Sequence, residues 1–122
     1  MGNTRTLSRL RAAAVVAAGG TGTRMNAGIP KQFLELAGRP ILCRTVARLA
    51  ELEQVREIVV ALPPEHIARA EALVGARARC VAGGVSRQDS VLNAVRALPA
   101  EIDVLLVHDA VRPLCPRDVM LR

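Results

Sequence analysis

Residues 12 to 31 read Ala-Ala-Ala-Val-Val-Ala-Ala-Gly-Gly-Thr-Gly-Thr-Arg-Met-Asn-Ala-Gly-Ile-Pro-Lys, and this stretch decides the fold. Its apolar run, Ala12 to Ala18, predicts a strand buried on both faces, as in a parallel sheet. Three glycines follow it directly: Gly19, Gly20 and Gly22. They let the backbone turn sharply and approach a ligand, and the N–H groups of such a turn favour an anion. The cations Arg24 and Lys31 indicate an anion with several charges, as in a triphosphate.

The rest of the chain alternates between apolar runs and stretches rich in Ala, Arg and Glu. We expect further strands at residues 57–62, 78–82 and 102–107, and a short extended piece at 32–36. Helices are expected from Pro40 to about residue 52, over 64–74, from 86 or 87 to 98, and from Pro116 onward. This order predicts an α/β fold, a Rossmann-like parallel sheet with helices on both faces.

The third of these helices shows a defined start and a defined apolar face. Ser86 is placed as its N-cap, and Asp89, three residues on, completes an imperfect capping box. The helical period predicts four buried side chains: Val91, Leu92, Val95 and Leu98.

Composition limits the classes of function. The 122 residues carry a net charge of +6, with a pI near 10.9, and such a charge raises nucleic-acid binding as a possibility. The arginines are scattered, and the chain has no Trp or Tyr to stack on bases, so no nucleic-acid partner is expected. No apolar run is long enough to span a membrane. Three isolated cysteines fit a reducing cytoplasm, which is the expected location.

The chain divides into a tail and one domain. Residues 1–11 are expected to form a disordered basic tail, with an organelle-targeting peptide as the alternative. Residues 12–122 are expected to form the domain. Ligands of such sheets bind beyond the carboxyl ends of the strands, and polar or glycine-rich loops follow three of the four strands there. These loops are residues 19–31, 83–90 and 108–112.

Individual residues on these loops suggest specific chemistry. Lys31 is the only lysine, which suggests a site that needs a compact ammonium group. Asp109 follows an apolar strand, a common place for a carboxylate that holds Mg²⁺ beside phosphates, or for a turn cap. Ser90 could hydrogen-bond a base or ribose, and Arg112 could pair with Asp109. The first loop is neither a dinucleotide fingerprint, because Met25 replaces the third glycine, nor a Walker A loop. A plain turn with spare glycines is the alternative.

Four motifs, in order and spacing, resemble one family. They are Ala18-Gly-Gly-Thr-Gly-Thr-Arg-Met25, Pro30-Lys-Gln32, Gly83-Gly84-x-x-Arg87-x-x-Ser90-Val91 and His108-Asp-Ala-Val-Arg-Pro113. From about Ala12 to its end the chain is similar to the amino-terminal part of the 2-C-methyl-D-erythritol 4-phosphate cytidylyltransferases of the non-mevalonate isoprenoid pathway. The resemblance implies a fold of the nucleotide-diphospho-sugar transferase type, with CTP and a polyol phosphate as substrates, Mg²⁺ as cofactor, and a homodimeric parent protein.

The resemblance also implies roles for the residues that match. Arg24 and Lys31 match the catalytic cations, and Asp109 matches the ligand of Mg²⁺. The residues that match nucleotide-binding positions are Ala18, Gly19, Gly20, Gly22, Gly84, Ser90 and Arg112.

Departures from the family pattern leave alternatives open. Ala17 and Gly19 replace residues common in the family, and the resulting Ala-Gly-Gly also resembles ribitol-5-phosphate cytidylyltransferases. Val85 stands where the family often has a polar residue. The chain ends at Arg122, before the family's acceptor-binding part, so we expect it to be an inactive fragment when alone. The competing hypotheses are a non-catalytic CTP-binding module and a dehydrogenase domain. Ala61-Leu-Pro-Pro64 argues against the dehydrogenase, because it lacks the expected acid.

Overall fold

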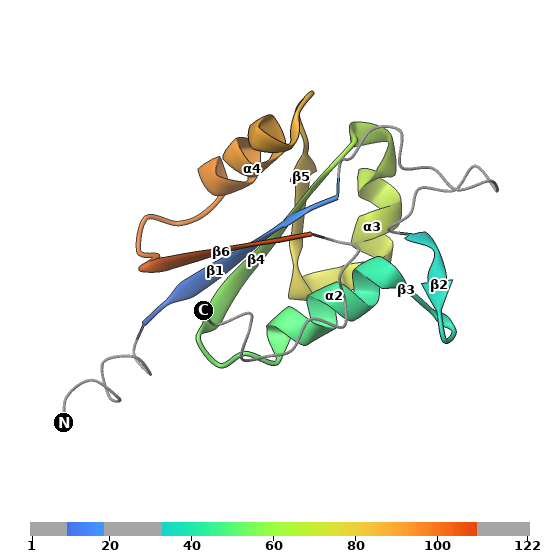
Figure 1. Cartoon of the computed structure of the whole chain (residues 1–122), viewed down its shortest axis with the longest axis horizontal. Helices are drawn as coiled ribbons and strands as arrows, with labels where there is room; N and C mark the ends of the chain where they lie inside the picture. Colours follow the sequence, from blue (N-terminus) through green and yellow to red (C-terminus); the bar gives the residue numbers. More distant parts are fainter. Residues whose placement is uncertain (1–9, 19–32, 110–122) are drawn as a thin grey trace.

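The computed structural model describes residues 10–18 and 33–109 of the chain. These residues form a four-stranded parallel sheet with helices packed against it (Figure 1). The strands are β1 (Ala12–Ala17), β4 (Val55–Leu62), β5 (Arg79–Ala82) and β6 (Val104–Asp109), in the spatial order β5-β4-β1-β6. All three pairings are parallel. β1 has a neighbour on each side and all six of its residues are buried. The first predicted strand is therefore confirmed as a central strand.

The helices connect successive strands and cover both faces of this sheet. They are α2 (Ile41–Ala50), α3 (Ile67–Val74) and α4 (Arg87–Arg96), with short 3-10 turns η2 (Pro64–His66) and η3 (Gly75–Arg77) at the two ends of α3. Two starts differ from prediction. Pro40 is the N-cap of α2 rather than its first residue, and Pro64 opens η2 rather than the α-helix itself.

Two separate cores define the two faces. On one face α2 and α3 pack on the sheet, and the cluster there includes Val16, Leu42, Val46 and Val60. On the other face Ala94 of α4 packs with Val15, Val59 and Ala61. Neighbouring residues of β1 thus enter opposite cores, as the alternation of a strand requires. Figure 1 shows α4 on one side of the sheet and α2 with α3 on the other. The predicted parallel sheet with helices on both faces is confirmed.

The short extended piece expected before α2 is one arm of a hairpin. β2 (Glu35–Leu36) pairs antiparallel with β3 (Arg39–Pro40). Ala37 and Gly38 form the turn with φ of 54° and 85°, and two successive positive φ angles suit a tight hairpin. The guanidinium of Arg44 donates a hydrogen bond of 3.0 Å to the carbonyl of Ala37, which ties the turn to α2.

The last strand begins and ends two residues later than predicted. Asp103 explains this shift, since it is bound to Arg11 at the entry to β1. Its backbone N–H donates to the Arg11 carbonyl at 2.8 Å, and its carboxylate accepts from the Arg11 N–H at 2.9 Å. These bonds align the starts of β1 and β6. Arg11, which was predicted to belong to the tail, is thus hydrogen-bonded to the start of β6.

Other predictions lie at the limits of the described residues. The tail up to residue 9 and the helix expected from Pro116 lie outside them. β4 begins at Val55, two residues earlier than predicted, because it pairs with β1 from Ala12 onward. Within the described part of the chain, no helix is long and apolar enough to cross a membrane.

Candidate functional site

The strands that precede the expected loops end at one edge of the sheet, the carboxyl edge. Ala17 at the end of β1 is in register with Asp109 at the end of β6. The N–H of Ala18 then donates to the carbonyl of Ala61 at 2.8 Å, and the N–H of Gly83 donates to the carbonyl of Leu62 at 2.8 Å. β4 therefore fixes the points at which the chain leaves β1 and β5. The strands that precede the three predicted loops, β1, β5 and β6, therefore all end at this edge of the sheet.

The order in which the chain forms its strands reverses direction at one point along this edge of the sheet. From β1 the chain moves outward through β4 to β5, and α4 then returns it to the opposite side of β1. The direction of winding changes between β1 and β6. In open α/β sheets, such a switch point is where ligands bind, outside the carboxyl ends of the strands. Ala18 and Asp109 flank it.

The turn that follows β5 is built around the hydroxyl of Ser90. The backbone N–H of Gly84 donates a hydrogen bond of 3.0 Å to Ser90 Oγ. Ser90 is 2% exposed, so its hydroxyl is buried beneath the turn. A Cβ added to Gly83 would lie 2.8 Å from the same oxygen, and one added to Gly84 would collide with the Cβ of Asp89. Both glycines are therefore required for the backbone to pass this close to α4.

The start of α4 is held by the predicted capping box. Ser86 Oγ accepts a hydrogen bond of 3.1 Å from the N–H of Asp89, and the Asp89 carboxylate accepts one of 3.4 Å from the N–H of Ser86. The positive end of the helix dipole therefore lies at the carboxyl end of β5. Such an end favours anionic ligands.

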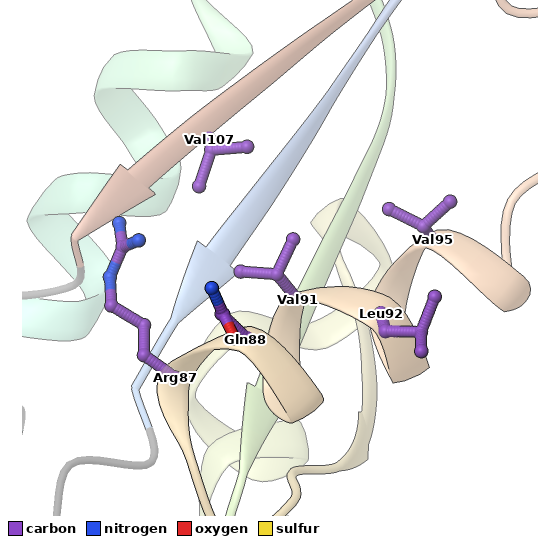
Figure 2. Close-up of a pocket in the computed structure, with 6 residues that line it drawn as sticks. All are labelled: Arg87, Gln88, Val91, Leu92, Val95 and Val107. Carbon is purple, nitrogen blue, oxygen red and sulfur yellow. The ribbon is translucent and has the colours of Figure 1, made fainter.

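Arg87 is a further cation at this edge, and it belongs to the motif Gly83-Gly84-x-x-Arg87, from which no role was predicted for it. It is the first residue of α4, and it is exposed. Figure 2 shows its side chain extending from the first turn of α4 on the side where Val107 of β6 lies. The signal that could have identified it was its place one residue after a helix N-cap, behind two glycines.

Phe33 anchors the chain where the described part resumes after the glycine-rich loop. It is 3% exposed. The guanidinium carbon of Arg69 lies 4.5 Å from its ring centre, and the ring of His66 meets it edge-on at 5.4 Å. No sequence pattern predicts this contact. The only signal was that Phe33 is the sole Phe, Tyr or Trp in the chain, two residues after Lys31.

The structure brings part of the predicted site together. Ala18, Gly84, Ser90 and the backbone of Asp109 lie at the carboxyl edge. The remaining predicted site residues lie outside the described part of the chain: Gly19, Gly20, Gly22, Arg24, Lys31 and Arg112. The described residues provide two features at this edge: a turn beside the positive end of the α4 dipole, and a switch point in the strand order. Such an arrangement is suited to an anionic ligand. In class, this is an α/β protein with a Rossmann-like parallel sheet.

Comparison with known proteins gives the family. The family model of 2-C-methyl-D-erythritol 4-phosphate cytidylyltransferase matches residues 12–122. The chain therefore belongs to the 2-C-methyl-D-erythritol 4-phosphate cytidylyltransferase family.

Curated relatives and a solved structure agree with this assignment. The cytidylyltransferase of Frankia casuarinae is 44% identical over 110 residues, which cover 90% of this chain and 41% of the relative. That of Thermobifida fusca is 45% identical, covering 87% of this chain and 45% of the relative. The crystal structure of the Thermus thermophilus enzyme aligns with a TM-score of 0.70 at 32% identity, covering 93% of this chain and 47% of that one. The chain thus spans less than half the length of each.

Proposed function

We propose that this chain supplies the CTP-binding half of a cytidylyltransferase. The complete protein would transfer CMP from CTP to 2-C-methyl-D-erythritol 4-phosphate and release pyrophosphate. The observation that carries the proposal is the family match over residues 12–122. The switch point between β1 and β6 supports it, at the edge where the strands that precede the three expected loops end. The names of the relatives support methylerythritol phosphate over ribitol phosphate as the acceptor.

The proposed reaction is an in-line displacement at phosphorus. An oxygen of the acceptor's phosphate attacks the α-phosphorus of CTP. The bond from that phosphorus to the bridging oxygen breaks, and the bridging oxygen leaves with the electron pair as part of pyrophosphate. Catalysis of such a transfer consists mainly of positioning and of stabilising charge on the phosphate oxygens. We assign charge stabilisation to Arg24 and Lys31, and triphosphate binding to the backbone of Gly19, Gly20 and Gly22.

The base would be bound by the turn after β5. Gly84 and Ser90 are the proposed cytosine contacts, and Ala18 and Arg112 complete the nucleotide-binding set. The hydrogen bond from Gly84 to Ser90 Oγ supports a rigid turn there. A turn fixed before the ligand arrives loses less conformational entropy on binding.

Mg²⁺ is the proposed cofactor, and Asp109 is its proposed protein ligand. The place of Asp109 at the end of β6, in register with Ala17, fits this role, because Mg²⁺ is usually bound by one or two carboxylates plus substrate phosphates. When bound there, the ion would neutralise charge on the phosphate oxygens of CTP. Asp109 would orient the triphosphate through that contact.

A CTP titration by calorimetry, followed by a pyrophosphate-release assay, tests the proposal. The 122-residue chain should bind CTP better than ATP and release negligible pyrophosphate. Arg24→Ala should lose most of this affinity. Arg39→Ala, at an exposed position in the hairpin, is the matched control and should keep it. Absence of CTP binding would refute the proposal.

The second candidate is a non-catalytic CTP-binding module. The observation favouring it is that the chain covers only 41% and 45% of the first two relatives. The two candidates can be distinguished with a fusion protein, in which the part of a relative that lies beyond its matched region is joined to the end of this chain. Turnover by that protein, lost in its Lys31→Ala variant, supports the transferase. CTP binding without turnover supports the module. The expected homodimer is a prediction for this longer protein.

A further inference from the structure

The turn after β5 is bound by a second side chain of α4, that of Asn93. Its amide Nδ2 donates a hydrogen bond of 3.2 Å to the carbonyl of Ala82, the last residue of β5. Within the described part of the chain, β5 pairs only with β4, so its outer side has no neighbouring strand. The Asn93 amide therefore supplies the donor that a further strand would otherwise offer to this carbonyl.

The peptide group between Ala82 and Gly83 is held from both sides. In a trans peptide the C=O and the N–H point in opposite directions, and the described residues include no cis peptide bond. The N–H of Gly83 donates to the Leu62 carbonyl in β4 at 2.8 Å, while the carbonyl of Ala82 accepts from Asn93 on the other side. Rotation of this peptide plane would break both bonds, so the backbone leaves β5 in one orientation.

The next peptide group of the turn is held by the same helix. The N–H of Gly84 donates to Ser90 Oγ at 3.0 Å. Ser90 and Asn93 are three positions apart in α4, and residues at this spacing are neighbours on one face of a helix. Glycines have more backbone freedom than other residues, so a turn that contains two of them depends on such bonds for a single conformation. One face of α4 therefore controls two consecutive peptide groups.

The far end of α4 is also bound to β5. The guanidinium of Arg79, the first residue of β5, donates a hydrogen bond of 2.9 Å to the carbonyl of Ala97, the C-cap of α4. A cation is favoured there, because the negative end of the helix dipole lies at the C-terminus. Hydrogen bonds at both ends of the helix thus fix the position from which Asn93 reaches Ala82.

We propose that Asn93 is a positioning residue for the base of the nucleotide. The inference rests on the proposed function, in which the turn after β5 contacts the cytosine. Asn93 acts through the peptide group between Ala82 and Gly83, and so sets the orientation in which Gly84 meets the base. A turn held in its binding orientation loses less conformational entropy when the ligand arrives. Loss of the Asn93 amide therefore weakens binding of the base and leaves binding of the phosphates unchanged.

The test compares two ligands on the 122-residue chain by calorimetry: CTP, and inorganic tripolyphosphate, which carries the charges but no base. Asn93→Leu keeps the size of the side chain and removes the donor, and Asn93→Ala removes both. In each variant the Kd for CTP should rise roughly fivefold, the size expected for one lost hydrogen bond, and the Kd for tripolyphosphate should not change.

Val95→Ala is the matched control, because it truncates a partly buried side chain of the same helix without removing a bond to the turn. It should bind both ligands like the unmodified chain. Unchanged CTP affinity in both Asn93 variants would overturn the inference. Equal losses for CTP and tripolyphosphate, or the same loss in Val95→Ala, would also overturn it, since either result indicates general destabilisation. Absence of CTP binding by the unmodified chain is a different outcome, which refutes the proposed function and the inference with it.

Hydrogen exchange measured by NMR tests the positioning without any ligand. In Asn93→Leu the amide of Gly83 should exchange roughly fivefold faster, because its peptide group is then held from one side only. The amides of the central strand β1 should exchange as in the unmodified chain. Unchanged exchange at Gly83 would show that Asn93 does not hold this peptide group, and the inference would be wrong.

Discussion

The hydroxyl oxygen of Ser90 accepts a hydrogen bond of 3.0 Å from the backbone N–H of Gly84, and this bond joins the turn after β5 to α4. The two residues are six positions apart, across the start of the helix. Both were expected at the nucleotide site from their match to the family, and the structure shows that they contact each other. Their roles are therefore coupled, since a change in either one alters the position of the other.

Ser90→Ala tests this coupling. The variant leaves the Gly84 N–H without its acceptor in a partly buried place, which should lower the free energy of unfolding by about 1–3 kcal/mol. CTP affinity should fall as well, because the turn loses its anchor. Urea unfolding and calorimetry measure the two effects.

Ser86→Ala is the control for stability alone. It removes the helix cap, at a cost of about 1 kcal/mol, while the bond from Gly84 to Ser90 is unaffected. It should bind CTP almost normally. If both variants lose the same affinity, general destabilisation explains the result and the coupling is wrong.

Gly83→Ala should be destabilising because the added methyl group would lie too close to Ser90 Oγ. The new methyl carbon would lie 2.8 Å from Ser90 Oγ, whereas the next nearest atoms, in the backbone of Leu62, lie at 3.5 Å, an ordinary contact. In a Ser90→Ala background the obstructing oxygen is absent, so the same change should cost less. A double-mutant cycle on unfolding free energies should give a coupling of about 0.5–3 kcal/mol. Additive costs would show that another contact makes Gly83 necessary.

Features with a local cause could be predicted from the sequence. The capping box of α4 depends on two residues three positions apart, and both of its hydrogen bonds are present. β1 was predicted to within one residue at its end, because an unbroken apolar run has few alternatives in an α/β chain. On α2 the buried leucine and valine side chains, Leu42, Val46 and Leu49, recur at the helical spacing that the sequence itself displays.

Features that depend on distant parts of the chain could not be predicted. Helical periodicity predicted four buried side chains for α4, but Leu92 is 47% exposed and Val91, Val95 and Leu98 are only partly buried. Periodicity shows which side chains share a face, not how far other parts of the chain cover that face. The start of β6 depends on Asp103 binding Arg11, 92 residues earlier. The contact of Phe33 with Arg69 likewise joins a loop to a helix with no pattern in either segment.

The ring of Phe33 should stabilise the fold through its two partners. Phe33→Leu keeps an apolar side chain but removes the contacts with Arg69 and His66, and should cost about 1–2 kcal/mol. Arg69→Gln should cost about 0.5–1 kcal/mol, as expected for an exposed cation–π pair. Both should lower CTP affinity, since Phe33 follows Lys31 by two residues.

Arg77→Gln, at an exposed position in η3, is the matched control and should stay within about 0.5 kcal/mol of the unmodified chain. The ring signals of Phe33 can be followed by NMR without overlap from Tyr or Trp, because the chain has neither. They should shift in Arg69→Gln and not in Arg77→Gln. An unshifted ring in Arg69→Gln would contradict the contact.

The thiol of Cys80 should make stability depend on alkaline pH. Burial of its side chain, and secondarily the carboxylate of Glu71, raise the pKa of this thiol from 9.0 to about 11. The unfolded chain releases the proton near pH 9.0 and the folded chain only near pH 11, so unfolding between these values releases a proton. The contribution of Cys80 is therefore complete below about pH 9 and is lost as the pH rises towards about 11.

Urea unfolding between about pH 8.5 and 11 measures this contribution, and Cys80→Ala should show a shallower decline in stability than the unmodified chain. Val81→Ala, a non-titrating truncation on the same strand, is the control and should lower stability equally at every pH. The same slope in Cys80→Ala and the unmodified chain would show that the thiol titrates alike in the folded and unfolded states.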